Sequence, residues 1–321
     1  MARILLTGGA GFIGSHVAEN LLARGDELVV LDNFNTFYDA SIKRRNAARL
    51  GAARIVDGDL RDAALIERLF TERFDAVIHL AAMAGVRPSL LDPLLYEDVN
   101  VRGTLLILEQ LKRQPQVRFV FASSSSVYGS NDKVPFSETD DIHSPMSPYA
   151  ATKRAGELHC FTYNHLYGIP ISALRFFTVF GPRQRPEMAI HKFVRAVLAR
   201  QPIPMYGDGS TRRDYTYIDD IVDGVVRALD RCAGYEIYNL GESQTTSLAE
   251  LIAMVGDVCG IEPLVDRQPT QPGDVEITFA DVSKARARLG YDPHTSVRDG
   301  LERFVDWYRE EHAQGGSKYG R

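Results

Sequence analysis

Short apolar runs alternate with stretches of helical spacing through the first half of the chain. The apolar runs predict buried strands over Arg3–Thr7, Glu27–Asp32, Arg54–Asp57, Asp75–Leu80 and Arg118–Ser123. Between them, apolar residues at helical spacing predict helices over Gly11–Arg24, Ser41–Leu50, Asp62–Glu72 and Leu94–Arg113. Continuous apolar strands that are separated by helices are typical of a parallel sheet covered on both faces. We therefore predict an α/β fold built on a doubly wound parallel sheet.

The second half of the chain departs from this pattern. A helix over Pro148–Tyr167 and a strand over Ile171–Phe176 extend the sheet, but beyond Gly181 many prolines divide the chain into short pieces. We expect a smaller, mixed α/β domain there, with Ile218–Arg231 and Glu236–Asn239 returning to the sheet. The predicted boundaries are residues 1–180 for the first domain, with 217–241 returning to it, and 181–216 and 242–321 for the second.

Composition excludes several classes of protein. The chain has 321 residues, 45% hydrophobic and 25% charged, with a net charge of −5, which are values of a folded domain without a general positive field for nucleic acid. No apolar run approaches the roughly 20 residues of a membrane span, and we expect no signal peptide. Cys160, Cys232 and Cys259 are far apart, so we predict three buried thiols, no metal site and a reducing, cytoplasmic environment.

Three glycines follow the first strand at positions suited to phosphate binding. Gly8 permits a tight turn, Gly11 lets the backbone approach a pyrophosphate, and Gly14 lets the following helix pack on the strand. The N-terminus of that helix, with Phe12 and Ile13, offers unpaired N–H groups to the phosphates. The strand–turn–helix context predicts a Rossmann-type dinucleotide site.

The ends of the next strands favour NAD over NADP. Asp32 ends the second strand, 24 residues after Gly8, where a carboxylate accepts hydrogen bonds from a ribose hydroxyl and repels a 2′-phosphate. Polar or small residues follow the other strands in equivalent positions. The predicted NAD site thus also includes Asn33, Asp59, Leu60, Leu80, Ala81 and Ala82.

A tyrosine and a lysine on one helix are the candidates for acid–base chemistry. Tyr149 and Lys153 are at i and i+4, on one face of the predicted helix. A phenol titrates near pH 10, and a neighbouring ammonium and an oxidised nicotinamide should lower its pKa. Alternation along the fifth strand places Ser124 and Ser126 on one face and Ser123 and Ser125 on the other. Ser124 is the predicted hydrogen-bond partner of the reacting hydroxyl. A pair of exposed surface residues is the alternative interpretation of Tyr149 and Lys153.

Together, these motifs resemble the extended short-chain dehydrogenase/reductase superfamily over nearly the whole chain, and within it the nucleotide-sugar epimerases. The resemblance extends to Arg213–Asp220 and Pro272–Val275, although Gln271 stands where that family often has an arginine. It implies NAD as cofactor, a UDP-sugar as substrate, and no nucleic-acid or membrane partner. It adds Asn100, Phe177, Tyr149 and Lys153 to the cofactor site. The implied substrate contacts are a diphosphate and ribose site at Arg213 and Asp274, and a uracil site at Met205 and Tyr206.

The residues before Val127 favour epimerisation within that family. The 4,6-dehydratases resemble one another in an Asp-Glu pair there, and the UDP-glucuronate decarboxylases in a Glu, whereas this chain has Ser125-Ser126. Three segments, Ala84–Arg87, Arg175–Pro182 and Arg183–Ala189, resemble UDP-glucuronate 4-epimerases more than UDP-glucose 4-epimerases. A sugar carboxylate would then be surrounded by neutral donors and positive charge, from Ser125, Ser126, Thr178, Arg185 and Arg87.

We therefore predict an isomerase that converts UDP-glucuronate to UDP-galacturonate through a 4-keto intermediate, with Ser124, Tyr149 and Lys153 as catalytic residues. The alternatives are a UDP-glucose or UDP-N-acetylglucosamine 4-epimerase, a UDP-glucuronate decarboxylase, and an NAD-binding regulator without activity. The resemblance also implies a homodimer through Leu94–Arg113 and Pro148–Tyr167, where the apolar side chains could equally belong to the core (Leu105, Leu108, Phe161, Tyr167).

Overall fold

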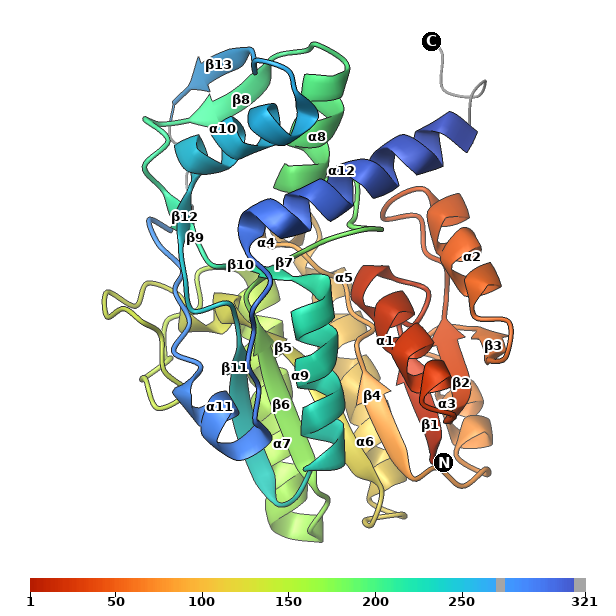
Figure 1. The fold of residues 1–321 in the computed structure, drawn as a ribbon. Helices are drawn as coiled ribbons and strands as arrows, with labels where there is room; N and C mark the ends of the chain where they lie inside the picture. Colours follow the sequence, from red (N-terminus) through yellow and green to blue (C-terminus); the bar gives the residue numbers. More distant parts are fainter. Residues whose placement is uncertain (270–274, 315–321) are drawn as a thin grey trace.

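The computed structural model describes residues 1–269 and 275–314, and a seven-stranded sheet forms its centre (Figure 1). The strand order is β11-β6-β5-β4-β1-β2-β3, and every neighbouring pair is parallel. The doubly wound, Rossmann-type α/β fold is thereby confirmed. These strands span β1 Arg3–Thr7, β2 Glu27–Asp32, β3 Arg54–Asp57, β4 Ala76–His79, β5 Arg118–Ser124, β6 Ile171–Phe176 and β11 Tyr235–Leu240.

Helices cover both faces of the sheet. One face packs against α1 (Phe12–Ala23) and α9 (Ile218–Asp230), and the other against α3 (Ala63–Leu69), α6 (Gly103–Leu111) and α7 (Pro148–Tyr167) (Figure 1). Within β1, Ile4 and Leu6 belong to one hydrophobic core and Leu5 to the other, as the alternation of side chains along a strand requires. The chain leaves β1 toward β2 and β3 and later returns beside β1 as β4, which creates a crevice at the carboxyl ends of these strands.

The single helix predicted over Leu94–Arg113 is divided in the structure. Asp92 caps the short helix α5 (Pro93–Tyr96), a π-helical turn η1 (Glu97–Arg102) follows, and α6 begins at Gly103. The side chain of Asn100 within this turn is hydrogen-bonded to both backbone polar groups of Met83. Apolar periodicity does not reveal such a local widening, because the apolar positions on both sides keep helical spacing.

The remaining elements of the first half are α2 (Ala40–Arg49), α4 (Val86–Leu91) and the 3-10 turn η2 (Ser125–Tyr128). Those of the second half form three small two-stranded pairings and four helices. The strand pairs are β7 (Thr178–Phe180) with β10 (Tyr215–Tyr217), β8 (Ile203–Tyr206) with β13 (Val265–Gln268), and β9 (Arg212–Arg213) with β12 (Thr246–Ser247). The helices are α8 (Ala189–Leu198), α10 (Leu248–Cys259), α11 (Ser283–Leu289) and α12 (Val297–Gln314).

The upper part of Figure 1 groups α8, α10, β8 and β13 beyond the carboxyl ends of the sheet strands. α12 runs beneath this group, toward the edge where α2 lies. The segment that contains α9 and β11 lies with the sheet, since β11 pairs with β6 along its length. The domain boundaries given above stay a prediction.

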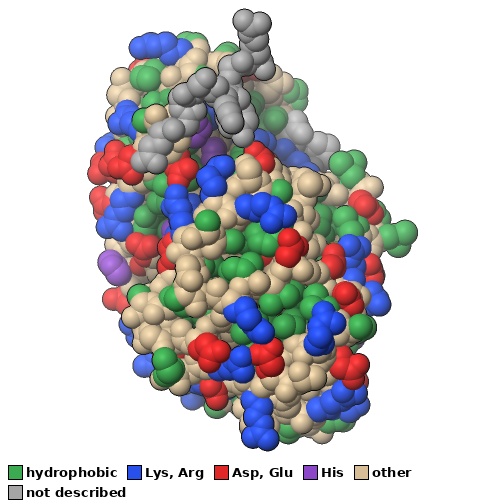
Figure 2. Space-filling view, turned by 90° about the vertical axis from the view of Figure 1, so that its right-hand side faces the viewer, with side chains coloured by type: hydrophobic (Ala, Val, Ile, Leu, Met, Phe, Trp, Pro, Cys, Tyr) green, Lys and Arg blue, Asp and Glu red, His purple; other side chains and the backbone are tan. Residues whose placement is uncertain are grey.

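Surface charge, the cysteines and helix hydrophobicity can be compared with the predictions from composition. On the face shown in Figure 2, basic and acidic side chains are interspersed and form no field of a single sign. Cys160, Cys232 and Cys259 are free and buried. Among residues 1–269 and 275–314, none of the helices combines the length and the apolar character that crossing a membrane requires.

Candidate active site

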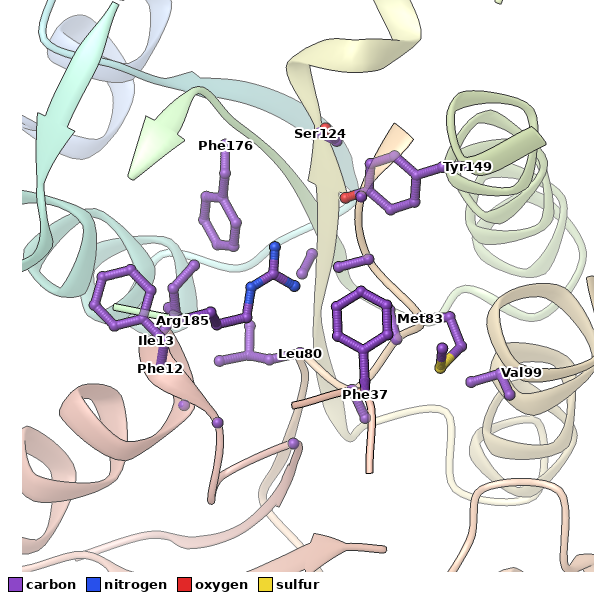
Figure 3. Close-up of a pocket in the computed structure, with 18 of the residues that line it drawn as sticks. Phe12, Ile13, Phe37, Leu80, Met83, Val99, Ser124, Tyr149, Phe176 and Arg185 are labelled. Carbon is purple, nitrogen blue, oxygen red and sulfur yellow. The ribbon is translucent and has the colours of Figure 1, made fainter. Parts of the chain in front are cut away.

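A cavity of about 380 Å³ lies at the carboxyl edge of the sheet. Its walls come from the loops that follow β1, β2, β3, β4, β5 and β6, together with the first turns of α1 and α7 (Figure 3). Most of the residues predicted from the sequence line it: Gly8, Gly11, Phe12, Ile13, Gly14, Asp32, Asn33, Asp59, Leu60, Leu80, Ala81, Ala82, Ser124, Ser125, Ser126, Tyr149, Lys153, Phe177, Thr178 and Arg185.

The glycine turn has no room for side chains at two of its positions. A Cβ atom on Gly14 would lie 2.1 Å from the carbonyl oxygen of Gly8, and a Cβ on Gly8 would lie 2.7 Å from the amide nitrogen of Ala81. Gly8 also has a positive φ of +73°. Gly11 precedes α1 and provides no side-chain cap, so the first N–H groups of the helix are left for a ligand. This arrangement fits the diphosphate of a dinucleotide.

Carboxylates line the next part of the cavity. Asp32 accepts hydrogen bonds from the backbone N–H groups of Phe34 at 2.9 Å and Ala10 at 3.1 Å, and burial raises its pKa. Asp59 accepts from Asn33 at 3.0 Å and pairs with Arg61 at 2.8 Å, and the Arg61 hydrogen bonds hold its pKa far below the usual range. Both acids thus have fixed orientations at the cavity wall.

Tyr149 and Ser124 meet at the opposite end of the cavity. Ser147 caps α7 by accepting a hydrogen bond from the N–H of Ala150, which places Tyr149 in the first turn of the helix. Figure 3 shows its hydroxyl pointing toward Ser124 at the end of β5. Burial raises the pKa of Tyr149, while a side-chain hydrogen bond with Ser124 and the charge of Arg185 oppose the shift.

Lys153 lies one turn along α7 from Tyr149, as the i, i+4 spacing predicts. Its Nζ donates a 2.7 Å hydrogen bond to the carbonyl oxygen of Ala122, and burial lowers its pKa to about 8. The sequence predicted a lowered pKa for Tyr149. With the protein's own groups alone its pKa is raised instead, because the effect of burial exceeds the opposing effects of Ser124 and Arg185. The lowering by an oxidised nicotinamide stays a prediction.

The predicted division of the four serines holds for Ser123, Ser124 and Ser126, but Ser125 lines the cavity with Ser124 instead of lying on the face of Ser123. β5 ends at Ser124, and Ser125 and Ser126 belong to the 3-10 turn η2 rather than to the strand. The turn returns the hydroxyl of Ser126 to within 3.0 Å of Ser124 Oγ. Ser123 points into the opposite core, where it donates to Glu157 at 2.6 Å.

Arg185 provides positive charge within the cavity. Its guanidinium lies between Phe176 and Phe37 in Figure 3, 5.7 Å from the centre of the Phe37 ring. Glu187 pairs with Arg185 Nε at 3.0 Å and so fixes the orientation of the guanidinium. Thr178 begins β7 on the same wall. This wall can therefore receive an anionic group next to Tyr149.

Of the predicted residues that the structure describes, five lie outside the cavity lining. Asn100 lies behind the wall and holds the backbone of Met83. Arg87 in α4 lies over the ring of Tyr206 in β8, 5.6 Å from its centre, so these two elements meet. Met205 is buried in β8 and Arg213 belongs to β9, where its Nη1 donates to the carbonyl of Arg212. Asp274 lies outside the described residues.

The cavity also includes residues that sequence reasoning missed. The segment after Asp32 contributes Asn35, Phe37, Tyr38 and Lys43, with Lys43 Nζ hydrogen-bonded to Asn35 Oδ1 at 2.7 Å. Their position just after the end of β2 could have predicted them, because ligands bind at the carboxyl edge of such a sheet. Other lining residues that were not assigned to the site individually include Met83, Ala84, Gly85, Val86, Val99, Phe176 and Met188, although Ala84–Val86, Phe176 and Met188 lie in segments singled out above.

The described residues contain no group of three or more His, Cys, Asp or Glu side chains arranged to hold a metal ion.

The fold and cavity define a dinucleotide-binding α/β protein with a tyrosine at the reactive end. Residues 5–304 match the family model described as GDP-mannose 4,6 dehydratase, and the chain belongs to this family.

Relatives and solved structures resemble the chain over nearly its full length. UDP-glucuronate 4-epimerase 1 of Arabidopsis thaliana is 45% identical, covering 95% of this chain and 76% of that protein. The UDP-glucuronic acid 4-epimerase of Bacillus cereus, solved with UDP-glucuronic acid and NAD, has a TM-score of 0.90 and 37% identity, covering 96% and 99%. The UDP-glucose 4-epimerase of Thermotoga maritima, solved with UDP-glucose, has a TM-score of 0.90 and 33% identity, covering 97% and 99%.

Proposed function

We propose that this protein is an NAD-dependent 4-epimerase that interconverts UDP-glucuronate and UDP-galacturonate. The observation that carries the proposal is the pairing of Tyr149 with Ser124 at the end of a dinucleotide cavity, beside two hydroxyls and an arginine rather than a carboxylic acid. The named activities of the relatives and the ligands of the Bacillus cereus structure support the same reaction.

The protein's own residues have distinct parts in this reaction. The glycine turn, Asp32 and Lys153 would hold NAD⁺, which would supply the acceptor and donor of a hydrogen with its electron pair for C4 of the sugar. Tyr149, as phenolate, accepts the proton of the 4-hydroxyl, and Ser124 donates a hydrogen bond to the same oxygen. Lys153 contributes positive charge and binds the cofactor ribose. Return of the hydrogen to the opposite face of the 4-keto sugar, with Tyr149 giving its proton back to the C4 oxygen, would invert the configuration at C4.

The residues before Val127 distinguish epimerisation from the other reactions of the family. Dehydration needs an acid to transfer a proton, and Ser125 and Ser126 have no carboxyl group to do so. Neutral hydroxyls from Ser125, Ser126 and Thr178, with the charge of Arg185, hold the sugar carboxylate. The 4-keto uronic acid is a β-keto acid, and a held carboxylate helps suppress its loss as carbon dioxide.

The second half of the chain, residues 181–216 and 242–321, binds the uridine diphosphate. Met205 and Tyr206 lie beside the uracil, Arg213 and Asp274 hold the diphosphate and ribose, and Arg87 supports Tyr206 from the sheet domain. The observation that supports this part is the contact of Arg87 with Tyr206.

Product identity with UDP-glucuronate as the only substrate tests the proposal. We expect UDP-galacturonate, with no release of carbon dioxide and slower turnover of UDP-glucose and UDP-N-acetylglucosamine. Tyr149→Phe should lower kcat by at least 10²-fold, in the range of a lost general base. Tyr163→Phe is the matched control, because Tyr163 is on the same helix and is hydrogen-bonded to Glu109 away from the cavity. Turnover of Tyr149→Phe within a few-fold of wild type would refute the role of the tyrosine.

We further propose a cytoplasmic homodimer. Large apolar side chains are exposed on α4, α5 and α7, among them Leu91 at 88%, Leu94 at 80% and Phe161 at 53%. Of the other positions considered from the sequence, Leu108 is buried in the core, and Leu105 and Tyr167 are half-buried. A second copy packed on this face would remove the exposed groups from water. A monomer in light scattering would contradict the proposal.

A further inference from the structure

A buried histidine that has no part in the proposed chemistry, His79, connects two elements behind the cavity. It ends β4, where Nδ1 lies 2.7 Å from Thr7 Oγ1 and Nε2 lies 3.0 Å from Thr104 Oγ1. Thr7 ends β1 and Thr104 belongs to α6, and both are fully buried, with His79 at 2% exposure. The imidazole therefore joins the strand before the glycine turn to the helix after the π-helical turn.

The hydrogen bonds around the ring have one consistent direction. The Thr104 hydroxyl donates to the carbonyl oxygen of Asn100 at 2.6 Å. A hydroxyl has one proton, so Thr104 can only accept from His79, and Nε2 must be protonated. Burial, assisted by the charge of Lys153, lowers the pKa of His79 to about 3, so the ring is neutral and Nδ1 is an acceptor. Thr7 then donates to Nδ1.

Both ends of this chain of hydrogen bonds reach the candidate active site. At one end, Thr7 Oγ1 accepts from the N–H of Ala81 at 3.2 Å, beside the glycine turn. At the other, Asn100 contacts Met83 through both backbone polar groups, at 2.8 and 2.9 Å.

From Asn100 the connection continues to the catalytic tyrosine. Its Nδ2 donates to Thr152 Oγ1 at 3.0 Å, and Thr152 donates to the carbonyl oxygen of Tyr149 at 2.8 Å. A path of hydrogen bonds thus runs from the wall of the cofactor cavity to the first turn of α7, passing at Asn100 from its backbone carbonyl to its side-chain amide.

We propose that His79 is a positioning residue. Its single neutral tautomer fixes the position of the cavity wall at Ala81 and Met83 relative to Tyr149. The role rests on the proposed function, since it places the cofactor relative to the base. A donor at Nε2 and an acceptor at Nδ1 keep these groups in place without a mobile charge in the core. The two sides of the ring should have separable effects, because Thr7 leads to Ala81 beside the glycine turn, whereas Thr104 leads through Asn100 to Met83 and the tyrosine.

Three substitutions separate the two sides. His79→Asn keeps an acceptor near the position of Nδ1 and loses the donor toward Thr104. His79→Gln keeps a donor near the position of Nε2 and loses the acceptor for Thr7. His79→Phe keeps a flat ring and loses both. His191→Phe is the matched control, because His191 is also buried but packs among the aromatic residues of α12.

The experiment measures the NAD⁺ dissociation constant, kcat and the midpoint of thermal unfolding for each variant, with kinetics taken well below that midpoint. We expect His79→Phe to weaken NAD⁺ binding and lower kcat, each by about tenfold, the effect of one lost buried hydrogen bond. His79→Asn should retain NAD⁺ affinity and lose kcat, and His79→Gln should show the reverse. His191→Phe should change the unfolding midpoint alone.

Equal losses of affinity and kcat in His79→Asn and His79→Gln, or a change in the unfolding midpoint alone, would overturn the proposal. Failure of the wild-type protein to epimerise any UDP-sugar would overturn the proposed function instead. In that case the NAD⁺ affinities still decide the role of His79: retention in His79→Asn with loss in His79→Gln supports it, and any other pattern refutes it.

Discussion

The buried ion pair of Glu157 and Arg175 allows a quantitative prediction, because neither residue has access to water. Glu157 is 0% and Arg175 is 1% exposed, and they form two hydrogen bonds of 2.8 and 2.9 Å. Glu157 also accepts from Ser123, behind the end of β5, and Arg175 donates to the hydroxyl of Tyr128 at 3.0 Å. The pair thus connects β5, α7 and β6 beneath the catalytic residues.

Glu157→Gln leaves the guanidinium of Arg175 buried without a counter-charge. Breaking a buried pair in this way costs about 3–5 kcal/mol, and about 2 °C per kcal/mol in a chain of this size gives a fall in Tm of roughly 6–10 °C. The double variant Glu157→Leu with Arg175→Met removes both charges at similar volume and should recover most of that loss. Glu67→Gln, which breaks an exposed pair with Arg113, should cost less than about 1 kcal/mol.

Thermal unfolding followed by circular dichroism and by the fluorescence of Trp307, the single tryptophan of the chain, measures these differences. Agreement of the two probes is needed before a midpoint is converted into a free energy. The reasoning is refuted if Glu157→Gln lowers Tm no more than Glu67→Gln does. It is equally refuted if the double variant is as unstable as Glu157→Gln, since the unpaired charge would then not be the cause.

Two further predictions concern the glycine turn and a buried carboxyl group. Gly14→Ala places a Cβ 2.1 Å from the carbonyl of Gly8, so NAD⁺ affinity in a titration should fall at least about tenfold, whereas Gly51→Ala meets no atom within 4 Å and should bind normally. Burial and the neighbouring charge of Asp220 raise the pKa of Glu242 from 4.5 to about 8. The folded chain therefore holds a proton that the unfolded chain releases, and this contribution to stability is lost as pH rises toward 8. Glu242→Gln should gain stability relative to wild type between about pH 5 and pH 8 in urea unfolding, and an equal difference at both pH values would contradict the assignment.

Local pattern predicted most of the fold. Each buried strand of a parallel sheet is apolar at successive positions, and each helix has an apolar face, so periodicity located β1 to β6 and α1, α7 and α9 within a few residues. It did not reveal η1, because a π-helical turn changes backbone hydrogen bonds without disturbing the apolar spacing. It also missed η2, where a serine run that looked like strand closes into a turn.

The sequence by itself determined the parts of the site that depend on neighbours in the chain. The glycine turn, the acid at the end of β2 and the i, i+4 pair of Tyr149 and Lys153 belong to single strand–turn or helix units, whose geometry is local. Only the tertiary structure decided which distant groups face them. Burial raised the pKa of Tyr149, a carbonyl of β5 took the ammonium of Lys153, and the tautomer of His79 followed from threonines on two other elements. The physical reason is that desolvation and hydrogen-bond direction depend on every element packed around a group, and that packing brings together residues far apart in the chain.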